Sequence, residues 1–201
     1  MPTVAEDFVA ALGKPTEKVT SGMQFKARSV QRLWDFLGVE AGWYKGRFLY
    51  LFGDKLAQFE PCLEAWSFLV PPNNGDRMIV GRNAYGSLLV VEDANKGGSE
   101  HVYVLDPFLV AYTTNENMTL AGLIGRLLPK GELGSFTDDS VYRDWVKANE
   151  VEPELEDILG FKTPRALGGT FDIHNIQLDG MIDYYRTTGP IYATALAKAN
   201  P

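Results

Sequence analysis

The chain contains one cysteine, two histidines and no long apolar run, and each shortage excludes a class of protein. Cys62 has no partner for an intramolecular disulfide, and two histidines leave few ligands for a zinc site. No apolar run approaches the roughly 18 residues of a membrane span. Residues 1–14 lack the basic stretch followed by a long apolar one that marks a secretion signal. We therefore expect a cytoplasmic protein with no membrane contact, no disulfide and no metal.

Motifs that carry enzyme chemistry are also missing. There is no glycine-rich loop ending in Gly-Lys-Ser/Thr, no Gly-x-Ser-x-Gly nucleophile turn and no Asp-x-Asp-x-Asp-Gly calcium loop. Cys62 falls in a predicted amphipathic helix beside Leu63 and Trp66, a setting typical of a small buried residue rather than a reactive thiol. The sequence thus predicts a protein that is not an enzyme and that uses no cofactor.

Positive charge is the scarcer sign, with 19 basic against 26 acidic residues and a net charge of -7. This balance argues against a protein that holds nucleic acid by its phosphates. Residues 132–157 contain nine acidic side chains and two basic ones, so this one segment carries the whole excess. Two interpretations remain open: an acidic face that steers a basic partner, or a solvated helical face that keeps the protein soluble.

Apolar residues spaced three and four apart predict helices, and glycine and proline breaks predict where they end. The expected helices span residues 6–12, 25–37, 55–66, 119–128, 141–148 and 178–185. Runs rich in β-branched and aromatic residues predict strands over residues 48–52, 78–80, 88–91, 102–105 and 109–112. Short breaks between the last four strands favour an antiparallel meander.

Helices and strands are segregated along the chain, which favours the α+β class, with helices packed on antiparallel sheets. A break rich in proline and asparagine spans residues 71–75. We interpret it as the boundary between two small sub-domains that share an interface, residues 1–75 and 76–201.

Several short segments resemble a known pairing of bacterial domains. Residues 33–38 (Leu-Trp-Asp-Phe-Leu-Gly) and 42–48 (Gly-Trp-Tyr-Lys-Gly-Arg-Phe) resemble the GAD-like domain, in which a helix ending in an aromatic and glycine leads to a Gly-Trp turn and an aromatic strand. Residues 63–66 (Leu-Glu-Ala-Trp) fall where that domain has Leu-x-x-Trp. Residues 81–88 and 159–169 are similar to the Arg-Thr-Ala-Phe-Gly and Tyr-Gly-Phe-x-Pro-x-Leu-x-Leu-Gly-Gly signatures of the domain usually fused behind it.

This pairing is similar to the Tdi-type immunity proteins, which neutralise a DNase effector of type VI secretion in the cell that makes it. The resemblance implies a GAD-like domain at residues 1–75, a Tdi-type C-terminal domain at residues 76–201, and a cytoplasmic bacterial protein that binds the toxin encoded beside it. Tyr85 stands where the first signature has Phe, and Leu159 where the second has an aromatic residue. Both positions are interpreted as structural, so these departures concern packing rather than the choice of toxin.

In this hypothesis the protein binds one toxin molecule and occludes its active site or the basic surface with which a nuclease holds DNA. A carboxylate-rich face can compete for those basic groups and raise the association rate. The expected partner-binding residues are Asp138, Asp139, Asp144, Glu150, Glu152, Glu154 and Glu156, with Tyr142 and Trp145 as aromatic anchors.

Two other functions stay open at this point. A cleft between the two halves around Arg82, Tyr85 and His174 would suit an enzyme or a receptor for a small ligand, since such clefts are common binding sites. The absence of a recognisable catalytic constellation counts against it. A regulatory interaction module without a toxin partner is the third possibility, and the sequence does not separate it from the first.

Overall fold

A computed structural model describes residues 3–19, 24, 28–72, 77–92, 100–114 and 118–199, with the backbone alone at residues 28–30, 33 and 199. Seven strands form one antiparallel sheet in chain order. They are β1 (Glu17–Lys18), β2 (Gly42–Tyr44), β3 (Leu49–Leu51), β4 (Arg77–Asn83), β5 (Leu88–Glu92), β6 (His101–Asp106) and β7 (Ala111–Thr113). A separate antiparallel pair consists of β8 (Asp157–Phe161) and β9 (Ile176–Gly180). The predicted α+β class and the antiparallel meander are confirmed.

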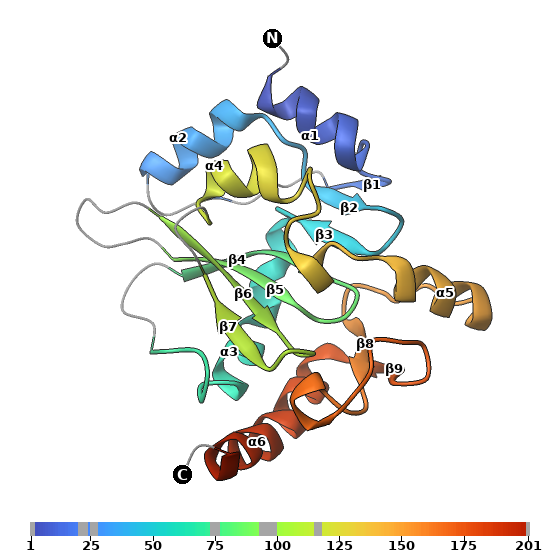
Figure 1. Ribbon diagram of the computed structural model, residues 1–201. Coiled ribbons are helices and arrows are strands. Elements are labelled where there is room, and N and C mark those ends of the chain that lie inside the picture. Colours follow the sequence, from blue (N-terminus) through green and yellow to red (C-terminus); the bar gives the residue numbers. More distant parts are fainter. Residues whose placement is uncertain are drawn as a thin grey trace.

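The helices surround this sheet unevenly (Figure 1). They are α1 (Val4–Leu12), α2 (Arg28–Leu37), α3 (Glu60–Ala65), α4 (Leu120–Gly122), α5 (Ser140–Asn149) and α6 (Met181–Ala199). The 3-10 helix η1 (Asp54–Phe59) precedes α3, the π-helix η2 (Leu123–Leu127) continues α4, and short 3-10 turns form η3 (Gly134–Phe136) and η4 (Arg165–Leu167). Figure 1 shows α1, α2 and α4 at one end of the molecule and α6 with β8 and β9 at the other, while α5 lies at the side.

The turn between β4 and β5 shows how local chemistry shapes the sheet. The side-chain oxygen of Asn83 accepts hydrogen bonds from the backbone N–H groups of Tyr85 (3.1 Å) and Ser87 (2.9 Å). Gly86 completes the turn at φ 85°, a conformation that favours glycine. These bonds define the turn, and the Tyr85 side chain enters the core, where its hydroxyl accepts from the Tyr142 N–H of α5.

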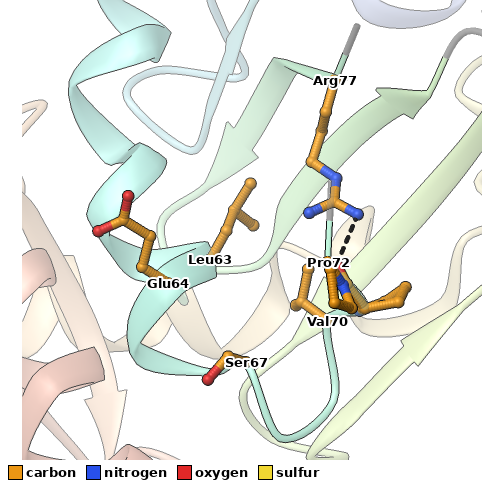
Figure 2. A pocket seen from close by; sticks show the side chains of 7 residues that line it. Leu63, Glu64, Ser67, Val70, Pro72 and Arg77 are labelled. Atoms are coloured by element: carbon orange, nitrogen blue, oxygen red, sulfur yellow. Dashed lines mark hydrogen bonds between the residues drawn. The ribbon is translucent and has the colours of Figure 1, made fainter. Parts of the chain in front are cut away.

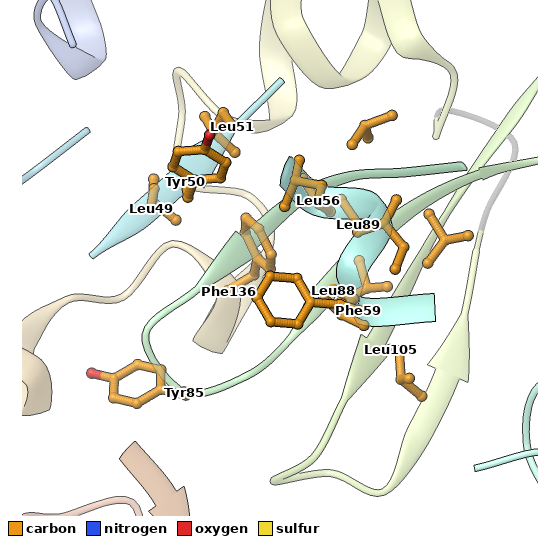
Figure 3. Packing of buried hydrophobic residues seen from close by; sticks show 14 of the residues in the cluster. Leu49, Tyr50, Leu51, Leu56, Phe59, Tyr85, Leu88, Leu89, Leu105 and Phe136 are labelled. Atoms are coloured by element: carbon orange, nitrogen blue, oxygen red, sulfur yellow. The ribbon is translucent and has the colours of Figure 1, made fainter. Parts of the chain in front are cut away.

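A single hydrophobic core extends across the molecule, and Figure 3 draws part of it, with side chains from β3, β5 and β6 beside Phe59 and Phe136. β3 pairs with β4 in the sheet, with Leu51 opposite Gly81. The indole N–H of Trp66 donates to the backbone oxygen of Tyr185 at 3.1 Å, 119 positions away. The sub-domain boundary expected between residues 75 and 76 falls in 73–76, outside the described residues, and strands on both sides of it belong to one sheet.

Two local expectations need correction. Residues 178–180 form the end of β9 instead of the start of a helix, because Leu178 pairs with Leu159 of β8, a strand that the pattern did not predict. Residues 109 and 110 lie in the turn before β7, where Phe108 and Leu109 N–H groups donate to the Asp106 carboxylate. The helix expected at 119–128 is confirmed by α4 and η2, of which η2 is π-helical. Within the described part of the chain, no helix combines the length and the apolar character needed to cross a membrane.

Candidate functional site

Helix α5 lies within the acidic segment, residues 132–157, and packs through its apolar side. Val141, Tyr142 and Trp145 are buried, at the three- and four-residue spacing of one helix face. The Tyr142 N–H donates to the hydroxyl of Tyr85 at 2.8 Å, and the Tyr142 ring lies 5.3 Å from that of Phe48. With 3% and 8% of their surface exposed, Tyr142 and Trp145 fill the core and hold α5 against it. They are not open to a partner at this surface.

The segment that follows α5 alternates between solvent and core. Glu152, Glu154 and Glu156 are exposed, whereas the intervening Pro153 and Leu155 are buried. From residue 152 to residue 156, every second side chain therefore faces solvent. We call residues 150–157 the acidic ledge, because the buried residues fix its path and the carboxylates line its outer side.

The start of the acidic ledge is set by a reversal of the chain at the end of α5. Glu150 adopts a left-handed conformation with φ 55°, and its N–H donates to the Val146 oxygen at 2.8 Å. This is the usual geometry for ending a helix, although glycine normally occupies the position. The next residue, Val151, stands between two exposed glutamates with 45% of its surface exposed.

Hydrogen bonds from two different elements hold the far end of the acidic ledge. The guanidinium of Arg82, in β4, donates to the backbone oxygens of Leu155 and Asp157. The backbone oxygen of Glu156 faces the opposite way and accepts from the Met181 N–H at 2.8 Å. A turn completes the arrangement, since the Glu154 N–H donates to the Asp157 carboxylate at 3.1 Å. The carboxylates therefore project from a backbone that is tied to the sheet and to α6.

Basic side chains compensate only part of the acidic surface. Arg47 forms ion pairs with Glu154 (2.5 Å) and Glu17 (3.0 Å), and these two carboxylates raise its pKa. The Nε of Arg143 lies 3.5 Å from the Oδ1 of Asp139. Among the described residues, no ion pair involves Asp138, Asp144, Glu150, Glu152 or Glu156. Five of the seven predicted partner-binding carboxylates thus keep their charge available to another molecule.

The three residues of the alternative cleft have different environments. Arg82 and Tyr85 are 0% and 1% exposed, and both side chains serve internal hydrogen bonds. His174 is exposed, its N–H donates to the Asp172 carboxylate at 2.8 Å, and its backbone oxygen accepts from Lys162 at 2.9 Å. A ligand at the surface near His174 would therefore meet neither of the other two side chains.

Two hollows elsewhere on the surface are lined by described residues. One, of about 370 Å³, lies between α3 and the start of β4 and is lined mainly by apolar groups such as Leu63 and Val70. Figure 2 shows Arg77 at this hollow, with a hydrogen bond from its guanidinium to the backbone oxygen of Pro71. Arg77 also forms an ion pair with Glu92 at 2.6 Å, so its charge is already compensated within the protein. The second hollow, of about 240 Å³, lies between β9 and α6 and includes Asp179 and Asp183.

Metal ligands and the cysteine thiol are two further features to locate. Within the described residues, no group of three or more histidine, cysteine, aspartate or glutamate side chains is placed to hold a metal ion. Burial raises the pKa of the Cys62 thiol to about 12, so the group stays protonated and unreactive at neutral pH.

Comparison with known proteins adds a structural relationship. The chain is similar to the crystal structure of Atu4351 from Agrobacterium tumefaciens, with a TM-score of 0.57 and 12% sequence identity, over 92% of this chain and 87% of that one. The two proteins share a fold. No protein-family model matches this sequence, and no curated protein is similar to it. At 12% identity the likeness to Atu4351 concerns architecture alone.

The pattern of the sequence does not single out Val151 as an exposed apolar residue, although a signal is present. A lone branched apolar residue between Glu150 and Glu152 has no core to join if the flanking carboxylates are solvated. At the acidic ledge Val151 is an exposed apolar side chain, whereas Tyr142 and Trp145 are buried.

Proposed function

We propose that this protein is an immunity protein that binds a basic toxin, a nuclease effector of type VI secretion, and neutralises it by stoichiometric occlusion. The observation that carries the proposal is the acidic ledge. Its outward glutamates alternate with buried residues and stand on a backbone anchored at Arg82 and Met181. The resemblance to Tdi-type proteins supplies the class of partner, and the acidic ledge supplies a surface that such a partner could use.

The arrangement of these carboxylates favours binding over mere solubility. A solubilising face needs charge but no fixed geometry, whereas the acidic ledge is non-helical and tied by long-range hydrogen bonds. A surface that is already ordered loses little conformational entropy when a partner docks. Carboxylates without internal ion pairs keep their full attraction for Lys and Arg, the residues with which a nuclease contacts phosphates.

The first experiment is co-purification of the tagged full-length protein from its native cells, through a moderate salt wash, with mass spectrometry of the bound material. The proposal predicts one stoichiometric protein encoded by the neighbouring gene. The purified pair should then show loss of nuclease activity that is complete at a molar ratio near one to one. A neighbouring protein that is expressed but neither binds nor is inhibited would refute the proposal and favour an interaction module without a toxin.

Charge neutralisation tests the acidic surface directly. In the variant Asp144→Asn, Glu150→Gln, Glu152→Gln, Glu156→Gln, we expect the association rate with the toxin to fall by about 10- to 100-fold at about 50 mM salt, because steering by opposite charge is strongest at low ionic strength. The difference should shrink to a few-fold at about 500 mM salt. Surface plasmon resonance at both salt concentrations measures it.

A matched variant supplies the control. Asp7→Asn, Asp35→Asn, Asp54→Asn, Glu64→Gln removes the same number of exposed carboxylates, all outside residues 132–157. If net charge alone mattered, both variants would slow association equally, and the acidic ledge would lose its place in the proposal. An unchanged rate in both would have the same consequence.

A further inference from the structure

Arg82 is an arginine without solvent exposure whose guanidinium serves backbone oxygens only. Its Nε donates to the Asn83 oxygen at 3.1 Å, Nη1 donates to Leu155 and Nη2 donates to Asp157 at 2.6 Å. The charged group also lies 5.6 Å from the centre of the Phe59 ring. Among the described residues, no carboxylate forms an ion pair with it. Burial lowers the pKa of Arg82 to about 10, which leaves it charged at neutral pH.

Burying such a charge is costly unless its donors are satisfied with good geometry. An apolar residue of similar size would fill the same space at a lower cost in free energy. Packing alone therefore does not explain why a charged residue occupies this position. The guanidinium is a planar fork whose donors point in fixed directions, which suits two acceptors held side by side. The oxygens of Leu155 and Asp157, two residues apart on one edge of the acidic ledge, are two such acceptors.

The position of Arg82 in the sheet gives this contact a fixed reference. Arg82 lies opposite Tyr50 of β3 and Leu88 of β5, so both neighbouring strands hold its backbone. The acidic ledge is 73 to 75 positions away in the chain. On its other edge, Glu156 accepts from Met181 at the start of α6. The far end of the ledge is therefore tied to the sheet by one side chain and to α6 by one backbone group.

We propose that Arg82 is the positioning residue of the acidic ledge, and that its two hydrogen bonds to Leu155 and Asp157 determine which way the glutamates of the ledge face. Its consequence for partner binding rests on the proposed function, whereas the positioning itself does not. A lysine at this position offers its donors from a single point and can replace one bond of the pair. A methionine fills the space and replaces neither.

Amide hydrogen exchange measured by NMR on the full chain tests the proposal without any partner. The reporters are the amides of Glu154, Asp157 and Met181, whose hydrogen bonds belong to the acidic ledge. In Arg82→Met we expect these amides to exchange at least about tenfold faster than in the native protein, because the local opening that exposes them becomes easier. In Arg82→Lys the acceleration should be smaller.

The control is Leu123→Ala, which removes a fully buried side chain in η2. It destabilises the whole fold, and global destabilisation does not accelerate amides that exchange through local opening. The proposal is overturned if the three reporters exchange at equal rates in the native protein and Arg82→Met, or if Leu123→Ala accelerates them as much. If Arg82→Met does not fold, the native protein and Arg82→Lys decide: reporters that are unprotected in the native protein, or unchanged in Arg82→Lys, overturn it.

The outcome is separable from that of the proposed function. Accelerated exchange in the Arg82 variants, together with no toxin binding by the native protein, keeps Arg82 as the positioning residue and removes the immunity role. Unchanged exchange, together with toxin binding that depends on the carboxylates, does the reverse.

Discussion

Gly168 and Gly169 are adjacent, yet the structure requires glycine at each for a different reason. Gly168 has φ 88°, and a Cβ added there meets nothing within 4 Å. Alanine at this position therefore costs the conformational penalty of a left-handed residue, about 1–2 kcal/mol. A more restricted unfolded chain offsets about 0.4–1 kcal/mol of that penalty. We expect Gly168→Ala to lower the free energy of unfolding by about 1 kcal/mol, the balance of these effects.

Gly169 is constrained by contact instead. A Cβ there would fall far inside van der Waals distance of the Thr163 backbone oxygen, and close to the amide of Asn175. Asn175 bonds Thr163 twice, by donating to its oxygen at 2.7 Å and accepting from its N–H at 3.0 Å. Moving Thr163 loses both bonds, at about 1 kcal/mol each, and leaves a buried amide partly unsatisfied, at about 1 kcal/mol more. Gly169→Ala should therefore cost about 3 kcal/mol.

Thermal unfolding of the two variants measures this difference. For a chain of this size, 1 kcal/mol corresponds to a shift in Tm of about 2–4 °C, so we expect losses of about 2–4 °C for Gly168→Ala and about 6–12 °C for Gly169→Ala. Asparagine, which tolerates the left-handed region, should be accepted at Gly168 and rejected at Gly169. Equal losses at the two positions, or the reverse order, would refute the reasoning.

Two further predictions concern the exposed valine and the buried thiol. Val151→Ser should weaken toxin binding about tenfold through faster dissociation with unchanged salt dependence, while Leu167→Ser, at similar exposure, should leave affinity unaltered; an equal effect of both would remove Val151 from the interface. Because the Cys62 pKa is about 12 in the folded chain and near 9 when unfolded, the unfolded state loses the proton first, and stability falls as pH rises above about 9. Urea unfolding from about pH 8 to about pH 10.5 should show the native protein losing stability relative to Cys62→Ala, and identical slopes would contradict the assigned burial.

Much of the fold could be predicted from local pattern. The meander from β4 to β7 was predictable because neighbouring strands pair across short turns, so a run of apolar segments largely implies its own partner. The strand β8 was not, because its partner β9 begins only after residues 162–175, and its five residues carry no distinctive alternation. The pattern places Leu178 in a helix, because its spacing to Met181 and Ile182 fits a helix equally well.

Some features of the acidic surface could also be predicted from the sequence. The position of the carboxylates follows from the sequence, since all the excess charge falls in residues 132–157. The burial of the aromatic residues of α5 could also be predicted from the sequence. Tyr142 and Trp145 share a helix face with Val141, and a stripe of this kind packs against a core.

By itself, then, the sequence determined the α+β class, the location of the negative charge and the burial of Cys62. All three follow from residue types and from the spacing of residues that are close together in the chain. Only the tertiary structure decided that Arg82 is buried and that it donates hydrogen bonds to the backbone oxygens of residues 155 and 157. These contacts hold the backbone of the acidic ledge, from which the glutamates beyond α5 project. A charged side chain is ordinarily solvated, and it goes inside only where distant backbone oxygens meet its donors. Such a meeting depends on chain segments more than 70 positions apart, which no local pattern records.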